Sequence, residues 1–363
     1  MFKYFYLSLV LLSLFLLISS CDDSSTTSDN NERTTEHKLY SRPGTSNYIY
    51  LIDYENFEFV RKIELGIPES MICYGLCLST KHDYFLFNAW DQENNGESKI
   101  LVYDINNEKI ISVFSLGMGM LGAVRLFPAN ITEEPGLAYL YTHTKGLYLF
   151  DFLEKKILEQ IFKNDGLQLH KWIRHSPNGK YTAVLTMYGE IQPSIIEVFD
   201  TESMLKNPLS VLNADNSDSI SVDDFLFSSS GELIYFSDRG RGRDMPVRVD
   251  KYDVQNRILI KSNLEIPFSL NPFYLAYSSQ RNELYTVGGL NLLYIIDSDS
   301  LTIKATVTLS GKKNGVSRLL LRPDEQILFI SAIDSDILYI INLNFRSIEK
   351  TIDLSQPYFL TIP

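Results

Sequence analysis

"KLYSRPGTSNYIYLID", residues Lys38 to Asp53, predicts a strand, a short polar turn, a second strand and a closing aspartate. The same order returns in "ELYTVGGLNLLYIID", residues Glu283 to Asp297, but there another strand, "NPFYLAYSS", comes first. Only a polar stretch stands between the apolar leader of the chain and Lys38. The first copy of this unit therefore lacks its opening strand, and the way in which that strand is supplied decides the fold.

The unit repeats along the whole chain. Runs rich in Tyr, Phe, Ile, Val and Leu are bounded by Gly, Asn, Asp, Pro and Ser, which is strand composition with turn punctuation. An apolar strand that ends in an acid or amide recurs roughly every 50 residues, and four strands per repeat at such a period are typical of a β-propeller. These strand ends are Asp53, Asp104, Asp151, Asp200, Asp253, Asp297 and Asn342.

The strand counts within the repeats indicate where the missing strand comes from. Third strands occur seven times, but complete first strands occur only six times, near Cys73, Val124, Ile173, Phe225, Leu275 and Leu319. The C-terminal "YFLTIP", Tyr358 to Pro363, is strand-like and has no other place in the pattern. We therefore expect an all-β fold, a seven-bladed β-propeller that is closed by pairing of the N-terminal strands with the C-terminal strand. This closure leaves no unpaired strand edge.

Three stretches carry a resemblance to a known family. "HSPNGKYTAVL", "RPDEQILFISA" and "YIIDSDSLTIKATVTLSG" resemble the repeats of YVTN-type seven-bladed propellers, although "YVTN" itself is absent and "LYTVGG" is its nearest version. The resemblance implies the propeller fold and an exported protein, often periplasmic or linked to a surface. It implies no single activity, because related propellers include binding modules, lactonases and amine dehydrogenase subunits.

The N-terminus has the features of a bacterial lipoprotein. Lys3 is followed by a nearly unbroken apolar run from Leu7 to Ile18, which is too short for a mature membrane span. "ISSC" resembles a lipobox, so Cys21 is the expected lipidation site; the alternative is an ordinary secretory signal with a free Cys21. We expect residues 1–20 to be the signal peptide, 21–37 a disordered tether and 38–363 the propeller. Palmitate and other acyl chains then hold the protein at the membrane of the cell envelope, in the periplasm or exposed at the surface.

Composition and motifs limit the classes of partner and cofactor that we expect for this protein. The formal net charge of −12 does not favour nucleic acid, whose backbone attracts cationic surfaces. Cys73 and Cys77 are too far apart for a disulfide if both lie on one strand, whereas a loop disulfide is possible if Cys73 lies in the entering loop. The sequence has no C-x-x-C-H haem site, no G-x-S-x-G elbow and no phosphate loop. We expect no cofactor, no metal site and a monomer.

The predicted ring places seven residues at the mouth of its central channel, one at the entry of each first strand. They are Gly75, Ala123, Trp172, Asp224, Tyr274, Arg318 and Tyr358. Aromatic rings with a few polar groups are the usual composition of a binding site, so five of them form the candidate ligand site: Trp172, Asp224, Tyr274, Arg318 and Tyr358. The alternative is that Arg318 and Asp224 pair with neighbours while the aromatic rings plug the channel.

Three loops on the same face are distinctive in composition. "LNADNSDSISVDD" (Leu212 to Asp224) is acidic and "SDRGRGRDMPVR" (Ser237 to Arg248) is basic, and we expect the two to neutralise each other. "SLGMGMLG" (Ser115 to Gly122) is rich in glycine and methionine. The sequence favours a membrane-tethered propeller that acts as a binding or scaffold module for a protein or glycan partner without catalysis. The alternative is a lactonase-like hydrolase that uses Asp224, Arg318 and the tyrosines at the channel mouth.

Overall fold

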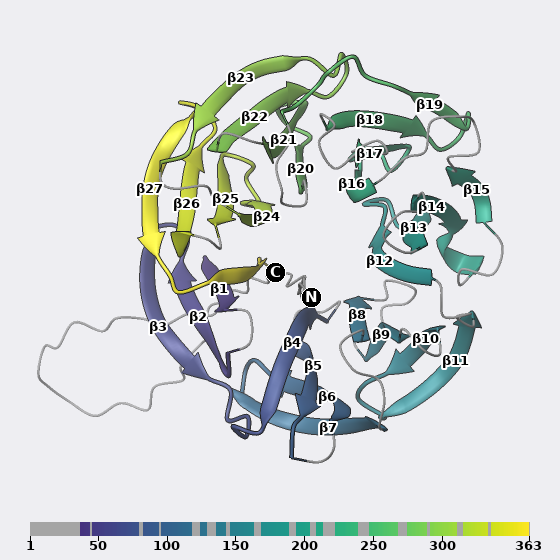
Figure 1. The fold of residues 1–363 in the computed structure, drawn as a ribbon, viewed down its shortest axis with the longest axis vertical. Helices are drawn as coiled ribbons and strands as arrows, with labels where there is room; N and C mark the ends of the chain where they lie inside the picture. The colour runs from purple at the N-terminus through teal and green to yellow at the C-terminus, as the bar shows by residue number, and fades with distance from the viewer. Residues whose placement is uncertain are drawn as a thin grey trace, which may run out of the picture.

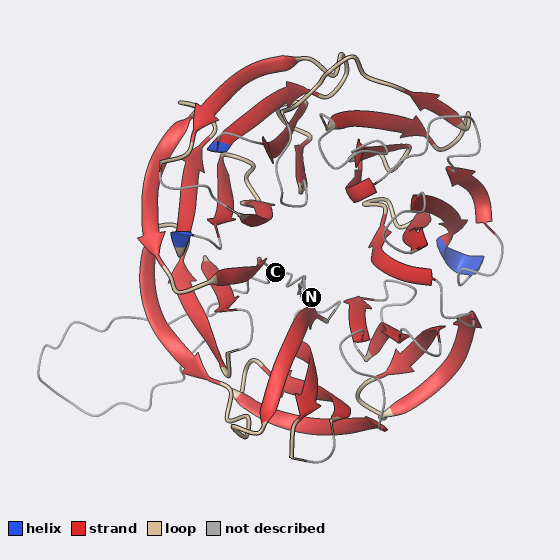
Figure 2. Cartoon of the chain, viewed as in Figure 1, coloured by secondary structure: helices blue, strands red, loops and turns tan. Residues whose placement is uncertain are grey.

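The chain forms a closed ring of seven four-stranded antiparallel sheets, a seven-bladed β-propeller (Figure 1). The computed structural model describes residues 37–43, 46–79, 83–93, 96–117, 124–128, 136–142, 146–162, 168–188, 194–203, 208–212, 222–238, 247–267, 274–288, 291–310, 315–332 and 335–362. The regular secondary structure of this ring is almost entirely strand, and the 3-10 helix η1 (Thr201–Ser203) is a short exception (Figure 2). The all-β propeller that the repeats predict is thus confirmed.

The blades follow one another along the chain, and each runs from an inner strand to an outer strand of the ring (Figure 1). Blade 1 consists of β28 (Pro357–Thr361), β1 (Lys38–Pro43), β2 (Tyr48–Asp53) and β3 (Glu58–Glu64). Blade 2 consists of β4 (Met71–Leu78), β5 (Tyr84–Asp91), β6 (Glu97–Asp104) and β7 (Lys109–Gly117). Blade 3 consists of β8 (Val124–Pro128), β9 (Leu137–Thr142), β10 (Gly146–Asp151) and β11 (Lys156–Phe162).

The remaining four blades keep the same order. Blade 4 consists of β12 (Gln168–His175), β13 (Tyr181–Tyr188), β14 (Ser194–Asp200) and β15 (Pro208–Leu212). Blade 5 consists of β16 (Val222–Phe227), β17 (Leu233–Asp238), β18 (Arg248–Asp253) and β19 (Ile258–Ile260). Blade 6 consists of β20 (Leu275–Ser278), β21 (Glu283–Gly288), β22 (Leu292–Asp297) and β23 (Ile303–Thr308). Blade 7 consists of β24 (Val316–Leu321), β25 (Ile327–Ala332), β26 (Ile337–Asn342) and β27 (Ser347–Asp353).

The C-terminal strand supplies the opening strand that the first blade lacks. β28 pairs antiparallel with β1, with Tyr40 opposite Thr361 and Ser41 opposite Leu360. A single hydrophobic cluster then joins blades 7, 1 and 2, and Leu39, Leu360 and Phe329 all belong to it. The ring is closed both by hydrogen bonds and by apolar packing.

The acid or amide at the end of each third strand has a local structural role. Asp53 accepts hydrogen bonds at Oδ1 from the backbone N–H groups of Glu55 (2.9 Å) and Asn56 (3.1 Å). Asn342 does the same for Asn344 and Phe345, at 3.0 and 3.2 Å. Short polar side chains of this kind stabilise turns by bonding the backbone that follows them. The repeat marker therefore shapes the turn into each fourth strand.

The turns between first and second strands also follow the sequence. In "SPNG" the N–H of Gly179 bonds the carbonyl of Ser176 at 2.9 Å, and Gly231 bonds Ser228 at the same distance. Both glycines have positive φ, which glycine adopts without steric cost. Blade 4 departs from the pattern, because η1 replaces the regular turn before β15.

Cys73 and Cys77 both lie on β4 and are free and buried. The expectation that one shared strand keeps them apart is confirmed, and the alternative of a loop disulfide is wrong. Burial raises the pKa of the Cys73 thiol to about 11, against a smaller opposite effect of the nearby Arg42 charge. Both thiols are packing groups of the inner strand.

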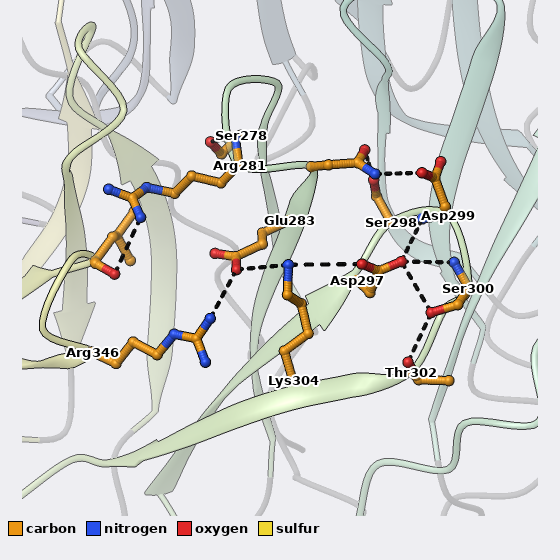
Figure 3. A network of polar contacts seen from close by, with 12 residues as sticks. Ser278, Arg281, Glu283, Asp297, Ser298, Asp299, Ser300, Thr302, Lys304 and Arg346 are labelled. Carbon is orange, nitrogen blue, oxygen red and sulfur yellow. Dashed lines mark hydrogen bonds and ion pairs between the residues drawn. The ribbon is translucent and has the colours of Figure 1, made fainter.

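Polar contacts join neighbouring blades at the end of the ring where the turns into the second and fourth strands lie (Figure 3). The buried carboxylate of Glu283 in blade 6 accepts a hydrogen bond from the hydroxyl of Tyr285 (2.9 Å) and ion-pairs with Lys304 (3.1 Å). It also contacts Arg346 of blade 7 at 3.3 Å. Arg281 reaches from blade 6 to the carbonyls of Glu325 and Leu343. This end of the molecule is built to hold blades in register.

Candidate functional site

The predicted mouth residues mark irregular places in the inner strands. Pairing shifts by one or more residues on β4, β12, β16, β24 and β28, which is the sign of a β-bulge. Gly75, Asp224 and Tyr358 lie within these shifts, and Trp172 and Arg318 are the first residues after theirs. Bulges often re-aim side chains beside functional sites. The alignment of the repeats therefore located positions that are structurally equivalent.

Three of these side chains meet although they come from three blades. Trp172 lies on β12, Tyr274 directly precedes β20, and Arg318 lies on β24. The rings of Trp172 and Tyr274 meet edge to face at 6.5 Å between centroids. The guanidinium carbon of Arg318 lies 4.8 Å from the Trp172 ring centre and 5.8 Å from that of Tyr274. Both distances are in the range of cation–π contacts.

Trp172 is the centre of this arrangement. It packs against three hydrophobic clusters, which belong to blades 3 and 4, blades 4 and 5, and blades 6 and 7. Its indole N–H donates to the backbone carbonyl of Asp223 at 3.2 Å, and the side chain remains partly exposed. β12, β20 and β24 all lie on the inner side of the ring (Figure 1). Trp172 thus spans the inner side from blade 4 to Arg318 of blade 7, which is the packing that the plug alternative describes.

Asp224 pairs with Arg174, a neighbour on β12 that the sequence analysis does not name. Its Oδ1 lies 2.7 Å from Nη2 of Arg174, and its Oδ2 accepts the backbone N–H of Leu275 at 3.0 Å. Its own backbone N–H bonds the hydroxyl of Ser237 at 3.1 Å, and only 1% of the residue is exposed. Asp224 therefore joins blades 4, 5 and 6 as a structural carboxylate.

Sequence reasoning missed Arg174. It stands two residues after Trp172 on the same strand, and alternate residues of a strand point to the same face. Its guanidinium carbon lies 5.7 Å from the Trp172 ring centre, so this ring is contacted by Arg174 and by Arg318. The spacing was a usable signal, since a cation at the second position beyond a predicted mouth residue shares its side of the sheet.

Arg318 differs from Arg174 in its partners. Within the described part of the chain, its Nη1 atom is buried and has no hydrogen-bond acceptor. Burial, followed by repulsion from Arg174, lowers the pKa of its guanidinium, while the carboxylate of Asp224 acts in the opposite direction. An arginine stays protonated in proteins all the same. The site therefore contains the positive charge of Arg318, whose Nη1 donor has no acceptor among the described residues.

Among known proteins, the chain is similar to solved structures, whereas no family model and no curated protein matches it. One similar structure is titled "Kuenenia stuttgartiensis Hydrazine Synthase", at 13% identity and a TM-score of 0.57, covering 82% of this chain and 89% of that one. A dihydro-heme d1 dehydrogenase, NirN, in complex with DHE has 12% identity, a TM-score of 0.59 and coverages of 89% and 74%.

A third similar structure is KlHsv2 with its loop 6CD replaced by a Gly-Ser linker, at 10% identity and a TM-score of 0.57. The match covers 85% of this chain and 93% of that one. The likeness is one of fold. At such low identities these structures establish the propeller architecture, and the activities in their titles belong to those proteins alone.

Several sequence-predicted features lie outside the described residues. These are Cys21 with the leader and the tether, Ala123, most of the acidic, basic and methionine-rich loops, and the side chain of Tyr358. Of the basic loop, Arg248 is described, and it pairs with Asp238 at 2.7 Å. The part of the ring that is described contains no group of three His, Cys, Asp or Glu side chains placed to hold a metal ion. No helix in the same residues combines the length and the apolar character needed to cross a bilayer.

Proposed function

We propose that this chain is an exported, lipid-anchored propeller that binds a protein or glycan partner at the cell envelope through Trp172, Tyr274 and Arg318. The observation that carries the proposal is the meeting of these three side chains from blades 4, 6 and 7 at bulged or entering positions of the inner strands. Residues far apart in the chain contribute one compact group of two aromatic rings and a cation. Groups of this composition are common in binding sites.

Binding without catalysis is favoured over hydrolysis by the state of Asp224. A general base must be within hydrogen-bond reach of the proton that it abstracts. Both carboxylate oxygens of Asp224 already accept bonds, one from Arg174 and one from the backbone of Leu275. No observation therefore favours a lactonase-like role for Asp224. Lactones and esters can be screened as substrates, with and without added divalent metal. Turnover by the wild type that is lost in Asp224→Asn contradicts the binding proposal.

The binding experiment compares the full chain with a variant that keeps its fold. Trp172 packs against three clusters, so the double variant Trp172→Phe with Arg318→Gln is preferable to alanine replacements. Immobilised protein is incubated with native envelope extract that is untreated, protease-treated or periodate-treated. We expect a bound component that the double variant loses and that the control Arg257→Gln, an exposed turn residue, retains. Equal capture by all three proteins contradicts the proposed site.

The finer parts of the proposal concern origin and anchoring. The quoted stretches that resemble YVTN-type repeats support an exported protein, and the "ISSC" sequence supports lipidation at Cys21. Metabolic labelling with palmitate tests the anchor directly. We expect label in the wild-type protein and in the membrane fraction, and neither in Cys21→Ser. Label that persists in Cys21→Ser contradicts the assignment of this cysteine.

A further inference from the structure

An arginine donor without an acceptor needs a physical explanation. A buried polar group that lacks a hydrogen bond destabilises the fold, and more so when it is charged. Arg318 Nη1 is such a group within the residues that the structure describes. The Trp172 and Tyr274 rings flank its guanidinium at 4.8 and 5.8 Å, but aromatic faces are weak acceptors compared with oxygen. The donor is therefore aimed at an oxygen that the described chain does not supply.

The carboxylate of Asp224 is bound to groups other than Arg318. Asp224 gives Oδ1 to Arg174 at 2.7 Å and Oδ2 to the N–H of Leu275 at 3.0 Å. No ion pair of Arg318 occurs among the described side chains, whereas Arg174 has its own carboxylate. The positive charge of Arg318 is thus balanced only at a distance, and its neighbour Arg174 opposes it.

We propose that Arg318 binds a carboxylate group of the ligand, with Trp172 and Tyr274 holding the guanidinium in place. This inference rests on the proposed binding function and adds the chemistry of the bound group. A guanidinium offers two parallel donors that match the two oxygens of a carboxylate. The net charge of −12 opposes polyanions, so the ligand carries one acidic group on an otherwise neutral body.

A purely structural role makes a different prediction. If cation–π contacts with the two rings fully explain Arg318, added carboxylates bind no more tightly than neutral compounds of the same shape. The chain offers a direct reporter, because it has only two tryptophans and Trp172 is one of them. Trp90, the other, has an indole N–H without an acceptor among the described residues, so Trp90→Phe removes no hydrogen bond there.

The experiment titrates the full chain in a Trp90→Phe background and follows Trp172 fluorescence at constant ionic strength. The probes are sodium benzoate, sodium D-glucuronate and the neutral benzamide. We expect saturable binding of at least one acid near neutral pH, weakened about ten-fold or more by Arg318→Gln, which corresponds to about 1.4 kcal/mol. We expect no change in Arg257→Gln and no response to benzamide. The acid that binds more tightly indicates whether the ligand body is flat or a sugar.

Two further measurements test whether Arg318 binds a carboxylate. Arg318→Lys keeps the charge but loses the fork, so we expect its affinity to lie between those of wild type and Arg318→Gln. Benzoate or glucuronate should raise the wild-type melting temperature relative to chloride, which needs no variant. Absent binding of both acids, or equal binding to Arg318→Gln, overturns the inference. If envelope capture still depends on Trp172 and Arg318 in that case, the proposed function stands and only its carboxylate chemistry is wrong.

Discussion

Two arginines on the inner side of this ring have opposite surroundings. Arg42 on β1 is fully buried, and its Nη2 donates to the carbonyls of Ser46 and Cys73, each at 2.9 Å. Its guanidinium carbon also lies 5.4 Å from the ring centre of Phe87. Arg318 has aromatic neighbours too, but it is partly exposed and one of its buried donors has no acceptor in the described chain.

This difference separates a structural cation from an available one. Burial lowers the pKa of both guanidinium groups. At Arg42 the charge is distributed over backbone oxygens that join blades 1 and 2, so the desolvation penalty is offset within the fold. At Arg318 part of the penalty remains, and a ligand oxygen would relieve it. Substitutions and deletions around the two arginines can test whether they differ in this way.

The largest expected effect comes from removing the strand that encloses Arg42. In the β1–β28 pair Arg42 lies opposite Phe359, so deleting Tyr358–Pro363 uncovers this arginine and opens the ring. Several backbone groups then lose partners at about 1–3 kcal/mol each, which together rivals a net domain stability of about 5–15 kcal/mol. We expect loss of cooperative unfolding in denaturant titrations followed by near-ultraviolet circular dichroism. A truncated protein that melts like the full chain contradicts the importance of this closure.

A matched pair of substitutions compares the arginines themselves. Arg42→Met leaves the carbonyls of Ser46 and Cys73 without their donor, and we expect a loss of about 3 kcal/mol in the free energy of unfolding. Arg318→Met keeps apolar contact with Trp172 and Tyr274 and removes an unpaired buried donor. Because the lost cation–π energy and the relieved desolvation cost are of similar size, we expect a change within about 1 kcal/mol. Equal destabilisation by both substitutions contradicts the distinction.

The features that sequence predicted share a local cause. Asp53 and Asn342 mark strand ends because their side chains bond the turn that follows, so the repeat is visible without knowledge of the ring. The bulged inner-strand positions of Trp172, Asp224 and Arg318 stand at a nearly constant distance before the first turn. Alignment therefore found equivalent positions, and the seven-bladed count followed from the missing strand that β28 supplies.

The features that sequence did not predict depend on the curvature of the ring. Arg174 of blade 4 pairs with Asp224 of the neighbouring blade 5, and Trp172 of blade 4 contacts Arg318 of blade 7. Which side chains pair depends on how the inner strands face one another around the ring. A local sequence pattern does not encode this arrangement. The sequence left two roles open for Asp224 and Arg318, pairing with neighbours or binding a ligand, and the three-dimensional arrangement shows that Asp224 pairs with Arg174.

A smaller effect is expected from the thiol beside Arg42. Burial raises the pKa of Cys73 in the folded protein to about 11, above its unfolded value near 9. The protonated thiol therefore contributes fully to the free energy of unfolding below pH 9, and this contribution is lost as the pH rises through 11. The unfolded chain ionises first, and the wild type loses roughly 2 kcal/mol more than Cys73→Ala over this interval. Ionisation of buried tyrosines is common to both proteins. Urea unfolding at several alkaline pH values measures the difference, and parallel pH profiles contradict it.

The smallest effect concerns the acid that stands beside Arg318 but belongs to Arg174. Asp224→Asn keeps an acceptor for the N–H of Leu275 and removes the ionic partner of Arg174, whose side chain is 26% exposed. Because solvent reaches that arginine, we expect a loss of only about 1–2 kcal/mol in the free energy of unfolding. Removing a negative charge near Arg318 also strengthens carboxylate binding, so benzoate should bind at least as tightly as to the wild type. Weaker binding in a folded Asp224→Asn protein would mean that Asp224 itself contacts the ligand, and the division between the two arginines would then be wrong.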